Sequence, residues 1–442
     1  MTIDRRGVLT AASAAALANV ATVARAATAE RRHFPRGFIW GASTAAHQIE
    51  GNNVSSDVWL LENVTPTLFA EPSGDAANSF ELWASDLDLA RRLGLNAYRF
   101  SLEWARIEPE QGRFSIAMLD HYKAIVEGCR ARDLTPVVTF NHYTTPLWFA
   151  ARGGWIAEDS PALFAAFCDR AARHLSADIG YACTLNEPNL SLMFSALLTP
   201  EKAAAVGPVL RAMNEAAGRA CGSASFANSI IPYLPDIPKV QQHLLAAHAQ
   251  AKAAIKAARS NLPVGVALAI RDEEDAPGEN VAAARRQSFY GPWLEAARSD
   301  DFVGVQNYAR VLWRGDRQLP PPEGSRLNAG GEEVYPPSLA NAVRYAHAVA
   351  GVPILVTEHG VGSDDDGLRA WLIPESLRAL HDVIGEGVPL LGYMHWSLLD
   401  NFEWMQGFRT HFGLCSVDRA TFARQPKPSA LVLRDIARRN GV

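Results

Sequence analysis

The amino-acid sequence predicts an α/β fold, a single (β/α)8 TIM barrel with long βα loops. Eight apolar, strand-like runs recur along the 442 residues, and helical patterns separate them. Most of the runs are continuously hydrophobic, as expected for parallel strands that are buried on both faces. Regular alternation of strand and helix favours a closed parallel barrel, and such barrels exceed about 400 residues when their loops are long.

The eight expected strands lie at residues 38–43, 96–104, 136–143, 181–189, 264–270, 302–308, 353–360 and 390–400. Residues 76–93 have the apolar spacing of a helix that stops at Gly94, and residues 240–258 form an alanine-rich helix that stops before Pro263. The two longest connections are expected to be loops, at 190–240 after the fourth strand and at 311–338 after the sixth.

The N-terminal residues 1–26 resemble a twin-arginine export signal. Arg5 and Arg6 precede a weakly apolar, alanine-rich run, and Ala24-Arg25-Ala26 has the form of a cleavage site. The run is too short and too polar to span a membrane. The sequence therefore predicts an export signal at 1–26, a catalytic domain at 27–442, and a periplasmic or secreted mature protein without a membrane span.

Bulk properties exclude some partners and cofactors. A formal charge of −5 gives no indication of a nucleic-acid partner. The five cysteines are scattered and odd in number, which favours buried apolar packing over a disulfide framework. Neither they nor the twelve histidines show a metal-ligand spacing, so no metal or other cofactor is expected. The oligomeric state is left open.

Two of the expected strands end in a glutamate, Glu187 in Thr-Leu-Asn-Glu-Pro and Glu358 in Thr-Glu-His-Gly. Taken alone, either residue could be a surface charge that closes a strand. In a parallel barrel, however, catalytic residues lie at the carboxyl ends of the strands. Two carboxyl groups at that face are what cleavage of a glycosidic bond requires, since one protonates the leaving oxygen and the other attacks the anomeric carbon.

Five motifs in order extend this interpretation. They are FPRGFIWGASTAAHQIEG at 34–51, NAYRFS at 96–101, TLNEP at 184–188, TEHG at 357–360 and HWSLLDNFEW at 395–404. Together they make the sequence resemble glycoside hydrolase family 1, the β-glucosidase family, from about residue 34 to residue 429. The resemblance implies a retaining β-glucosidase that acts on a small β-glycoside.

The resemblance also implies catalytic roles. Glu187 would be the general acid/base and Glu358 the nucleophile, which forms a covalent glycosyl-enzyme. Arg99 and Tyr308 would keep Glu358 ionised, and Asn186 would bond the sugar 2-hydroxyl. The negative charge of Glu358 should in turn raise the pKa of Glu187. As alternatives, Arg99 could be an ordinary ion-pair partner and Asn186 could shape a turn.

The sugar pocket implied by the resemblance combines aromatic faces with polar side chains, from Gln48, His142, Trp396, Glu403, Trp404 and Phe412. Packing in the core is the alternative for each tryptophan. Glu403 is more telling, because a carboxyl group beside two tryptophans needs hydrogen-bond donors such as sugar hydroxyls. A carboxylate there would also repel phosphate, which argues against the branch of the family that cleaves 6-phosphoglycosides.

Four positions depart from the family pattern. His359 and Gln306 stand where asparagine is usual, Tyr143 where tryptophan commonly follows the histidine, and His411 where arginine is common. None of the four is expected to touch the two glutamates. They leave the choice among glucose, galactose and fucose open. The aglycone surface is also left open, because apolar residues after the fourth strand fit either this surface or helix packing: Met193, Phe194, Leu197, Leu198 and Phe226.

There are two rival functions, and the sequence tests only one of them. A non-catalytic carbohydrate-binding relative would typically lack one of the glutamates, whereas both are present here. A transglycosidase would use the same residues and differ only in the acceptor that it binds, so sequence does not separate it from a hydrolase.

Overall fold

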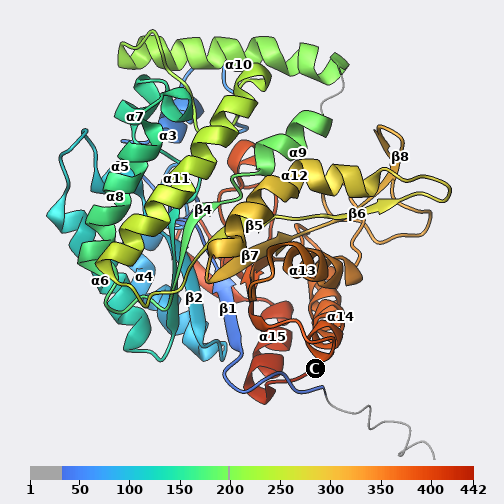
Figure 1. The fold of residues 1–442 in the computed structure, drawn as a ribbon. Coiled ribbons are helices and arrows are strands. Elements are labelled where there is room, and N and C mark those ends of the chain that lie inside the picture. The colour runs from blue at the N-terminus through green and yellow to red at the C-terminus, as the bar shows by residue number, and fades with distance from the viewer. Residues whose placement is uncertain (1–31, 198–199) are drawn as a thin grey trace, which may run out of the picture.

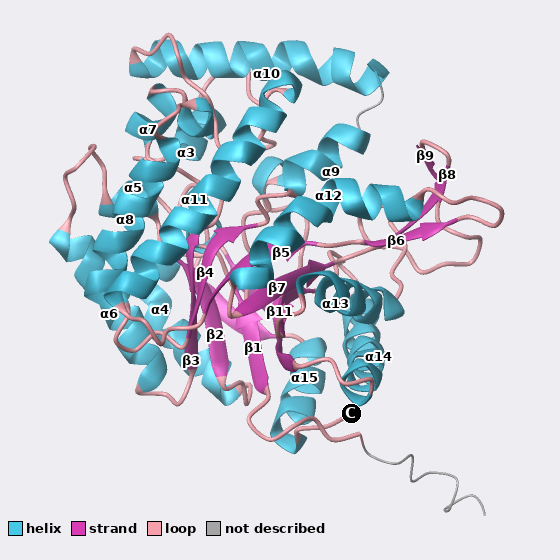
Figure 2. Cartoon of the chain, viewed as in Figure 1, coloured by secondary structure: helices cyan, strands magenta, loops and turns pink. Residues whose placement is uncertain are grey.

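The computed structural model describes residues 32–197 and 200–442, and the expected export signal lies outside this part of the chain. Eight parallel strands close into a barrel in the order β1-β11-β10-β7-β5-β4-β3-β2. Figures 1 and 2 show the strands at the centre with helices around them. The predicted fold class is confirmed. The barrel strands are β1 (Ile39–Ser43), β2 (Ala97–Ser101), β3 (Thr135–Asn141), β4 (Tyr181–Asn186), β5 (Val264–Ala269), β7 (Phe302–Asn307), β10 (Ile354–His359) and β11 (Leu390–Trp396).

Each strand falls within or close to its predicted range, but several stop earlier than predicted. The ladder ends where the chain turns out of the barrel, and the following residues belong to loops or short helices. After β2, for example, helix α5 (Trp104–Ile107) begins at a residue that the apolar pattern had assigned to the strand. Apolar character continues past the ladder because these segments are also buried.

The main helices that surround the barrel are α4 (Ser79–Arg92), α6 (Ile116–Arg130), α8 (Ser160–Leu175), α11 (Ile237–Ala258), α12 (Ala282–Ala296), α13 (Pro337–Ala350), α14 (Asp366–Gly385) and α15 (Pro428–Arg439). Two of them, α4 and α11, are the helices expected from spacing. Short helices in the loops are α2 (Ala46–Ile49), α3 (Asp57–Asn63) and α7 (Leu147–Ala151). Among the described residues, no helix combines the length and the apolar character that crossing a bilayer requires.

The connection at 190–240 is not the loop that the sequence predicted. It contains α9 (Leu190–Leu197) and the 22-residue helix α10 (Pro200–Cys221), which lies across the top of Figure 1 over α3 and α7. Leu210, Met213 and Ala217 of α10 pack with Val58 and Leu61 of α3 in a second apolar cluster. Tertiary burial, rather than a strong local pattern, therefore stabilises the helix.

The connection at 311–338 also contains more than loop. Its first residues continue β8 (Arg310–Arg314), which pairs with β6 (Asp272–Asp275) and β9 (Arg317–Gln318) in a small outer sheet. A two-stranded sheet of β12 (Cys415–Asp418) and β13 (Ala423–Pro426) precedes the last helix.

One side chain from each of the eight strands fills the barrel interior. This ring is formed by Ile39, Ala97, Val137, Cys183, Ala267, Phe302, Leu355 and Met394. The layer is apolar and buried, and it closes the barrel below the carboxyl ends of the strands. Cys183 in this ring fits the predicted packing role, as do Cys129, Cys168 and Cys415. Cys221 is half-buried.

Candidate active site

The two glutamates lie on opposite parts of the same barrel face. Glu358 belongs to β10, and its neighbour in the parallel ladder is Gln306 of β7. Glu187 follows the last residue of β4 and has a φ of 44°. A glutamate rarely adopts this left-handed conformation, which directs the side chain as the strand ends.

Glu358 is held by three donors from two other strands. Arg99 Nη1 of β2 lies 2.5 Å from Glu358 Oε1, and Gln306 Nε2 donates to the same oxygen at 2.9 Å. Tyr308, directly after β7, donates its hydroxyl to Oε2 at 2.7 Å. Burial raises the pKa of Glu358 above its usual value, and Arg99 most strongly, then Tyr308 and Gln306, oppose this rise. These donors favour the ionised carboxylate.

Asn186 is oriented by the same network. Its Oδ1 accepts from Arg99 Nη2 at 2.6 Å and from Gln306 Nε2 at 2.8 Å. Its amide nitrogen lies 3.2 Å from His142 Nε2. Burial, and then the charge of Arg99, lower the pKa of His142 well below its usual value, so the imidazole is neutral. Nε2 then accepts from Asn186, and the proton of the ring belongs on Nδ1.

Glu187 has a different environment. Its Oε2 accepts a hydrogen bond from the hydroxyl of Tyr143. Burial, and then the negative charge of Glu358, raise the pKa of Glu187 to about 8, against the smaller lowering effects of Tyr143 and Arg99. A carboxyl group with this pKa is protonated at neutral pH and can donate its proton.

Polar atoms without a protein partner gather beside the carboxyl pair. Gln48 Nε2 donates to Asn401 Oδ1 at 2.9 Å and to the Phe402 carbonyl at 2.8 Å, which leaves Gln48 Oε1 unpaired. Glu403 Oε1, Gln306 Oε1 and His142 Nδ1 are also buried without a partner. Burial raises the pKa of Glu403 well above its usual value. Unpaired buried groups are costly, so this set suits a ligand rich in hydroxyl groups.

Aromatic rings form a wall next to these atoms. Trp396 and Trp404 both stack on His142, with ring centroids 5.8 Å and 6.2 Å from that of His142, respectively. Phe412 meets the Tyr308 ring edge-on at 5.8 Å. The structure thus brings together all the residues that the sequence predicted for the site.

The four departures from the family pattern divide into two groups. His359 is turned toward Tyr393, whose hydroxyl lies 3.0 Å from His359 Nδ1, and His411 pairs with Asp364 at the surface. Gln306 and Tyr143, by contrast, bond directly to the two glutamates. The expectation that none of the four touches them was wrong, because neighbours across the barrel are far apart in sequence.

Further residues that support the site were not singled out from sequence. Thr139 of β3 accepts from Arg99 Nε at 3.0 Å. His47 stacks parallel to Trp404 at 5.6 Å, and its Nε2 lies 2.7 Å from Glu62. The position of His47, next to Gln48 in the N-terminal motif, was the only sequence feature that could have indicated its place in the site.

The predicted aglycone residues are described only in part. Met193 and Phe226 are buried in the two apolar clusters, which agrees with the packing alternative. The side chains of Phe194 and Leu197 and the whole of Leu198 lie outside the described part of the structure.

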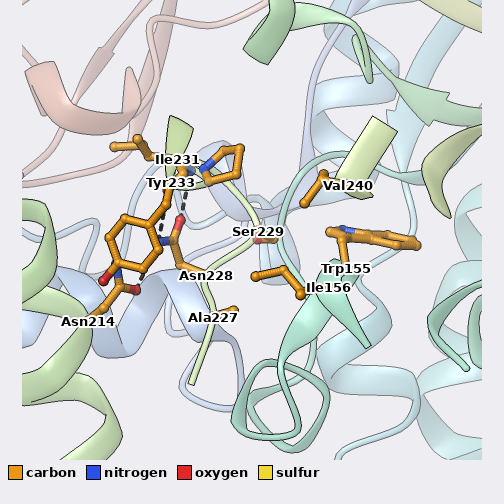
Figure 3. A pocket seen from close by; sticks show the side chains of 10 residues that line it. Trp155, Ile156, Asn214, Ala227, Asn228, Ser229, Ile231, Tyr233 and Val240 are labelled. Atoms are coloured by element: carbon orange, nitrogen blue, oxygen red, sulfur yellow. Dashed lines mark hydrogen bonds between the residues drawn. The ribbon is translucent and has the colours of Figure 1, made fainter. Parts of the chain in front are cut away.

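A pocket away from the two glutamates lies between α10, the segment 227–233 and the start of α11 (Figure 3). Its lining includes Trp155, Asn214, Asn228 and Tyr233, and neither glutamate. Asn228 donates to Asn214 Oδ1 at 2.9 Å and accepts from the backbone N–H of Ile231 at 2.7 Å. These asparagines serve each other and the backbone, so we interpret the pocket as a packing gap.

Comparison with known proteins agrees with this geometry. The family described as Glycosyl hydrolase family 1 matches residues 30–298 and 325–442. Thermostable beta-glucosidase B of Thermobispora bispora is 31% identical, over 92% of this chain and 91% of that protein. A beta-galactosidase of Sulfolobus acidocaldarius is 27% identical, over 92% and 96%. The crystal structure of beta-glycosidase BGL167 superposes with a TM-score of 0.86 at 45% identity, over 92% of this chain and 97% of that one.

Fold, site and relatives together define an enzyme of the glycoside hydrolase class. The chain belongs to glycosyl hydrolase family 1.

Proposed function

We propose that this protein is a retaining β-glucosidase, with Glu358 as nucleophile and Glu187 as general acid/base. The observation that carries the proposal is the unequal environment of the two carboxyl groups. Burial favours the neutral form of both carboxyl groups, but three donors oppose it at Glu358, whereas the negative charge of Glu358 adds to it at Glu187. A nucleophile must be ionised and an acid protonated at the same pH, and this arrangement supports both.

In the first step the Glu358 carboxylate attacks the anomeric carbon while Glu187 gives its proton to the glycosidic oxygen. The aglycone leaves as an alcohol. Glu358 is then an uncharged ester, so the charge that raised the pKa of Glu187 is gone. In the second step Glu187, now a carboxylate, removes a proton from water, and the water cleaves the ester with net retention.

The unpaired atoms indicate how the sugar is held. Gln48 Oε1 and Glu403 Oε1 would accept from sugar hydroxyls, and His142 Nδ1 would donate to one. The amide of Asn186 lies beside the acid and would contact the 2-hydroxyl, where hydrogen bonds strengthen in the transition state. Trp396 offers a flat apolar face for the sugar ring.

A second glycone is a candidate because one relative is a beta-galactosidase. Glucose and galactose differ in the orientation of the 4-hydroxyl, so Gln48 and Glu403 would decide between them. Most of the relatives compared are beta-glucosidases, which favours glucose.

The proposal is tested by trapping the covalent intermediate. An activated 2-deoxy-2-fluoro-β-glucoside slows the second step, and peptide mass spectrometry then locates the adduct. We expect a fluoroglucosyl group on Glu358. The corresponding 2-deoxy-2-fluoro-β-galactoside is tested in parallel, and labelling by this reagent alone would make galactose the preferred sugar. A folded protein that neither reagent labels and that turns over no glycoside would refute the enzymatic function.

We also propose that the protein is exported by its N-terminal segment. The support is the sequence pattern at 1–26, with Arg5 and Arg6 before the apolar run. N-terminal sequencing of the mature protein should find a start after Ala26. Replacement of both arginines by lysine should keep the protein in the cytoplasm, and export that is unaffected by this change would contradict the proposal.

A further inference from the structure

Tyr143 lies between the sugar pocket and Glu187. It follows β3 by two residues, and its ring meets His142 edge-on at 5.2 Å and Trp404 at 5.3 Å between centroids. Its hydroxyl donates to Oε2 of Glu187. The two ring contacts fix the side chain, and its polar end is directed at one oxygen of the carboxyl group.

The backbone supports the same contact. Tyr143 has a φ of 68° and Glu187 a φ of 44°, both in the left-handed region that large side chains rarely adopt. Each residue comes shortly after a barrel strand, β3 or β4, and those strands are neighbours in the sheet. The fold therefore bends the chain at both strand ends in the way that brings the two side chains together.

This hydrogen bond determines where a proton can be. A neutral carboxyl group has one carbonyl oxygen, which accepts, and one hydroxyl, which donates. Because Tyr143 donates to Oε2, the proton of neutral Glu187 belongs on Oε1. When that proton leaves, the bond from Tyr143 becomes charge-assisted and strengthens.

We propose that Tyr143 is a positioning residue for proton transfer, holding the Glu187 proton on Oε1 and stabilising the carboxylate that remains. The inference rests on the proposed role of Glu187. In the first step the Oε1–H bond breaks and the proton passes to the glycosidic oxygen. The bond from that oxygen to C1 breaks, with its electron pair staying on the oxygen, and a carboxylate oxygen of Glu358 bonds to C1. Tyr143 keeps its own proton.

The groups that face Glu187 set the direction of the expected pH effect. Besides Tyr143 they are Glu358, Arg99 and Tyr308. Burial and the Glu358 charge raise the pKa of Glu187, and Tyr143 and Arg99 lower it. The pKa of Tyr308 is raised well above its usual value by burial, so it stays neutral. Loss of the Tyr143 hydroxyl should therefore raise the pKa of Glu187.

The test compares Tyr143→Phe with the full-length wild type on aryl β-glucosides of different leaving-group acidity. The ring contacts remain and only the hydroxyl is lost. We expect kcat/KM to fall about ten-fold for poor leaving groups and less than about two-fold for 2,4-dinitrophenyl glucoside, which needs little protonation. The alkaline limb of the pH profile should move up by about one pH unit.

Tyr308→Phe is the matched control, since it removes the same group from Glu358. It should slow both kinds of substrate and move the acid limb instead. Tyr143→Leu, which has no hydrogen-bond donor in its side chain, provides a second variant if the first folds poorly, and it should move the alkaline limb in the same direction.

Equal losses on both kinds of substrate, or an alkaline limb that stays in place in both Tyr143 variants, would show that the hydroxyl only packs. Failure of the proposed function would be seen elsewhere, as a Glu187→Ala variant that does not distinguish good from poor leaving groups.

Discussion

The two carboxyl groups of the site occupy different surroundings on one barrel face. Around Glu358, donors come from β2 and from the end of β7, and Arg99 and Gln306 also bond Asn186, so that the network is continuous. Around Glu187, one side-chain donor, Tyr143, comes from the loop after β3. Glu358 is embedded among rigid strands, and Glu187 stands where a strand turns into a loop.

The neighbouring residues, and not the residue type, therefore distinguish the proposed acid from the proposed nucleophile. Both side chains are glutamate and both are removed from water. The number and charge of the donors separate their protonation states, as two carboxyl groups with distinct roles require.

Removal of the Glu358 carboxylate should have the greatest effect on activity. Glu358→Ala should lower turnover of β-glucosides by more than about 10⁴-fold, because no covalent intermediate can form. Small anions such as azide should restore part of the rate by entering the space left. Steady-state assays check both points, with Glu386→Ala, an exposed glutamate paired with Arg344, as the control that stays active. Normal activity of Glu358→Ala would refute its role.

Glu187→Ala removes the proposed general acid/base and leaves Glu358 in place. Substrates with poor leaving groups should lose about 10³-fold in kcat/KM, while activated aryl glucosides should lose little in the first step because they need no acid. A burst of aryl alcohol followed by slow turnover should appear, since water is no longer activated. Stopped-flow and steady-state assays on one pair of substrates distinguish these outcomes, and equal losses on both would exclude the acid role.

Glu403→Ala leaves both carboxyl groups in place and removes a sugar contact. We expect a loss of about 10²-fold in kcat/KM for glucosides, together with weaker discrimination between glucosides and galactosides. The loss reflects unpaired hydroxyls in the pocket. Parallel assays on the two nitrophenyl glycosides measure it. A change below about two-fold would place the sugar elsewhere.

The smallest effect concerns stability. The folded-state pKa of Glu187, about 8, lies above the ordinary value of 4.5. Folding therefore favours the neutral form, and its contribution to stability is lost as pH rises from the lower value through the higher one. Glu187→Gln, which stays neutral, should be more stable than wild type by about 2 kcal/mol at pH 6 and about equal at pH 4. Thermal unfolding at the two pH values checks the sign, and a constant difference would contradict it.

The barrel was predictable from the sequence, because continuous apolar runs are a local property of each strand. The structure brings the predicted side chains together, from Gln48 near the start to Phe412 near the end. Their catalytic and binding roles remain predictions that the variants above address.

The features that could not be predicted from the sequence depend on contacts between distant segments of the chain. Gln306 and Tyr143 were noted as unusual residues, but their bonds to the glutamates arise from strand pairing and from backbone bends that no local pattern shows. Helix α10 was predicted as loop, because its apolar side chains are buried by residues far away in the sequence, such as Val58 and Leu61 of α3. Tertiary packing decided both cases.

The apolar ring that closes the barrel below the site has a kinetic consequence. With that side sealed, water has to approach the glycosyl-enzyme from the side where the aglycone departs. We therefore expect the aglycone to leave before water takes its position beside the glycosyl-enzyme. With the covalent intermediate, this order predicts ping-pong kinetics, and an alcohol at high concentration should compete with water and receive the sugar in its place.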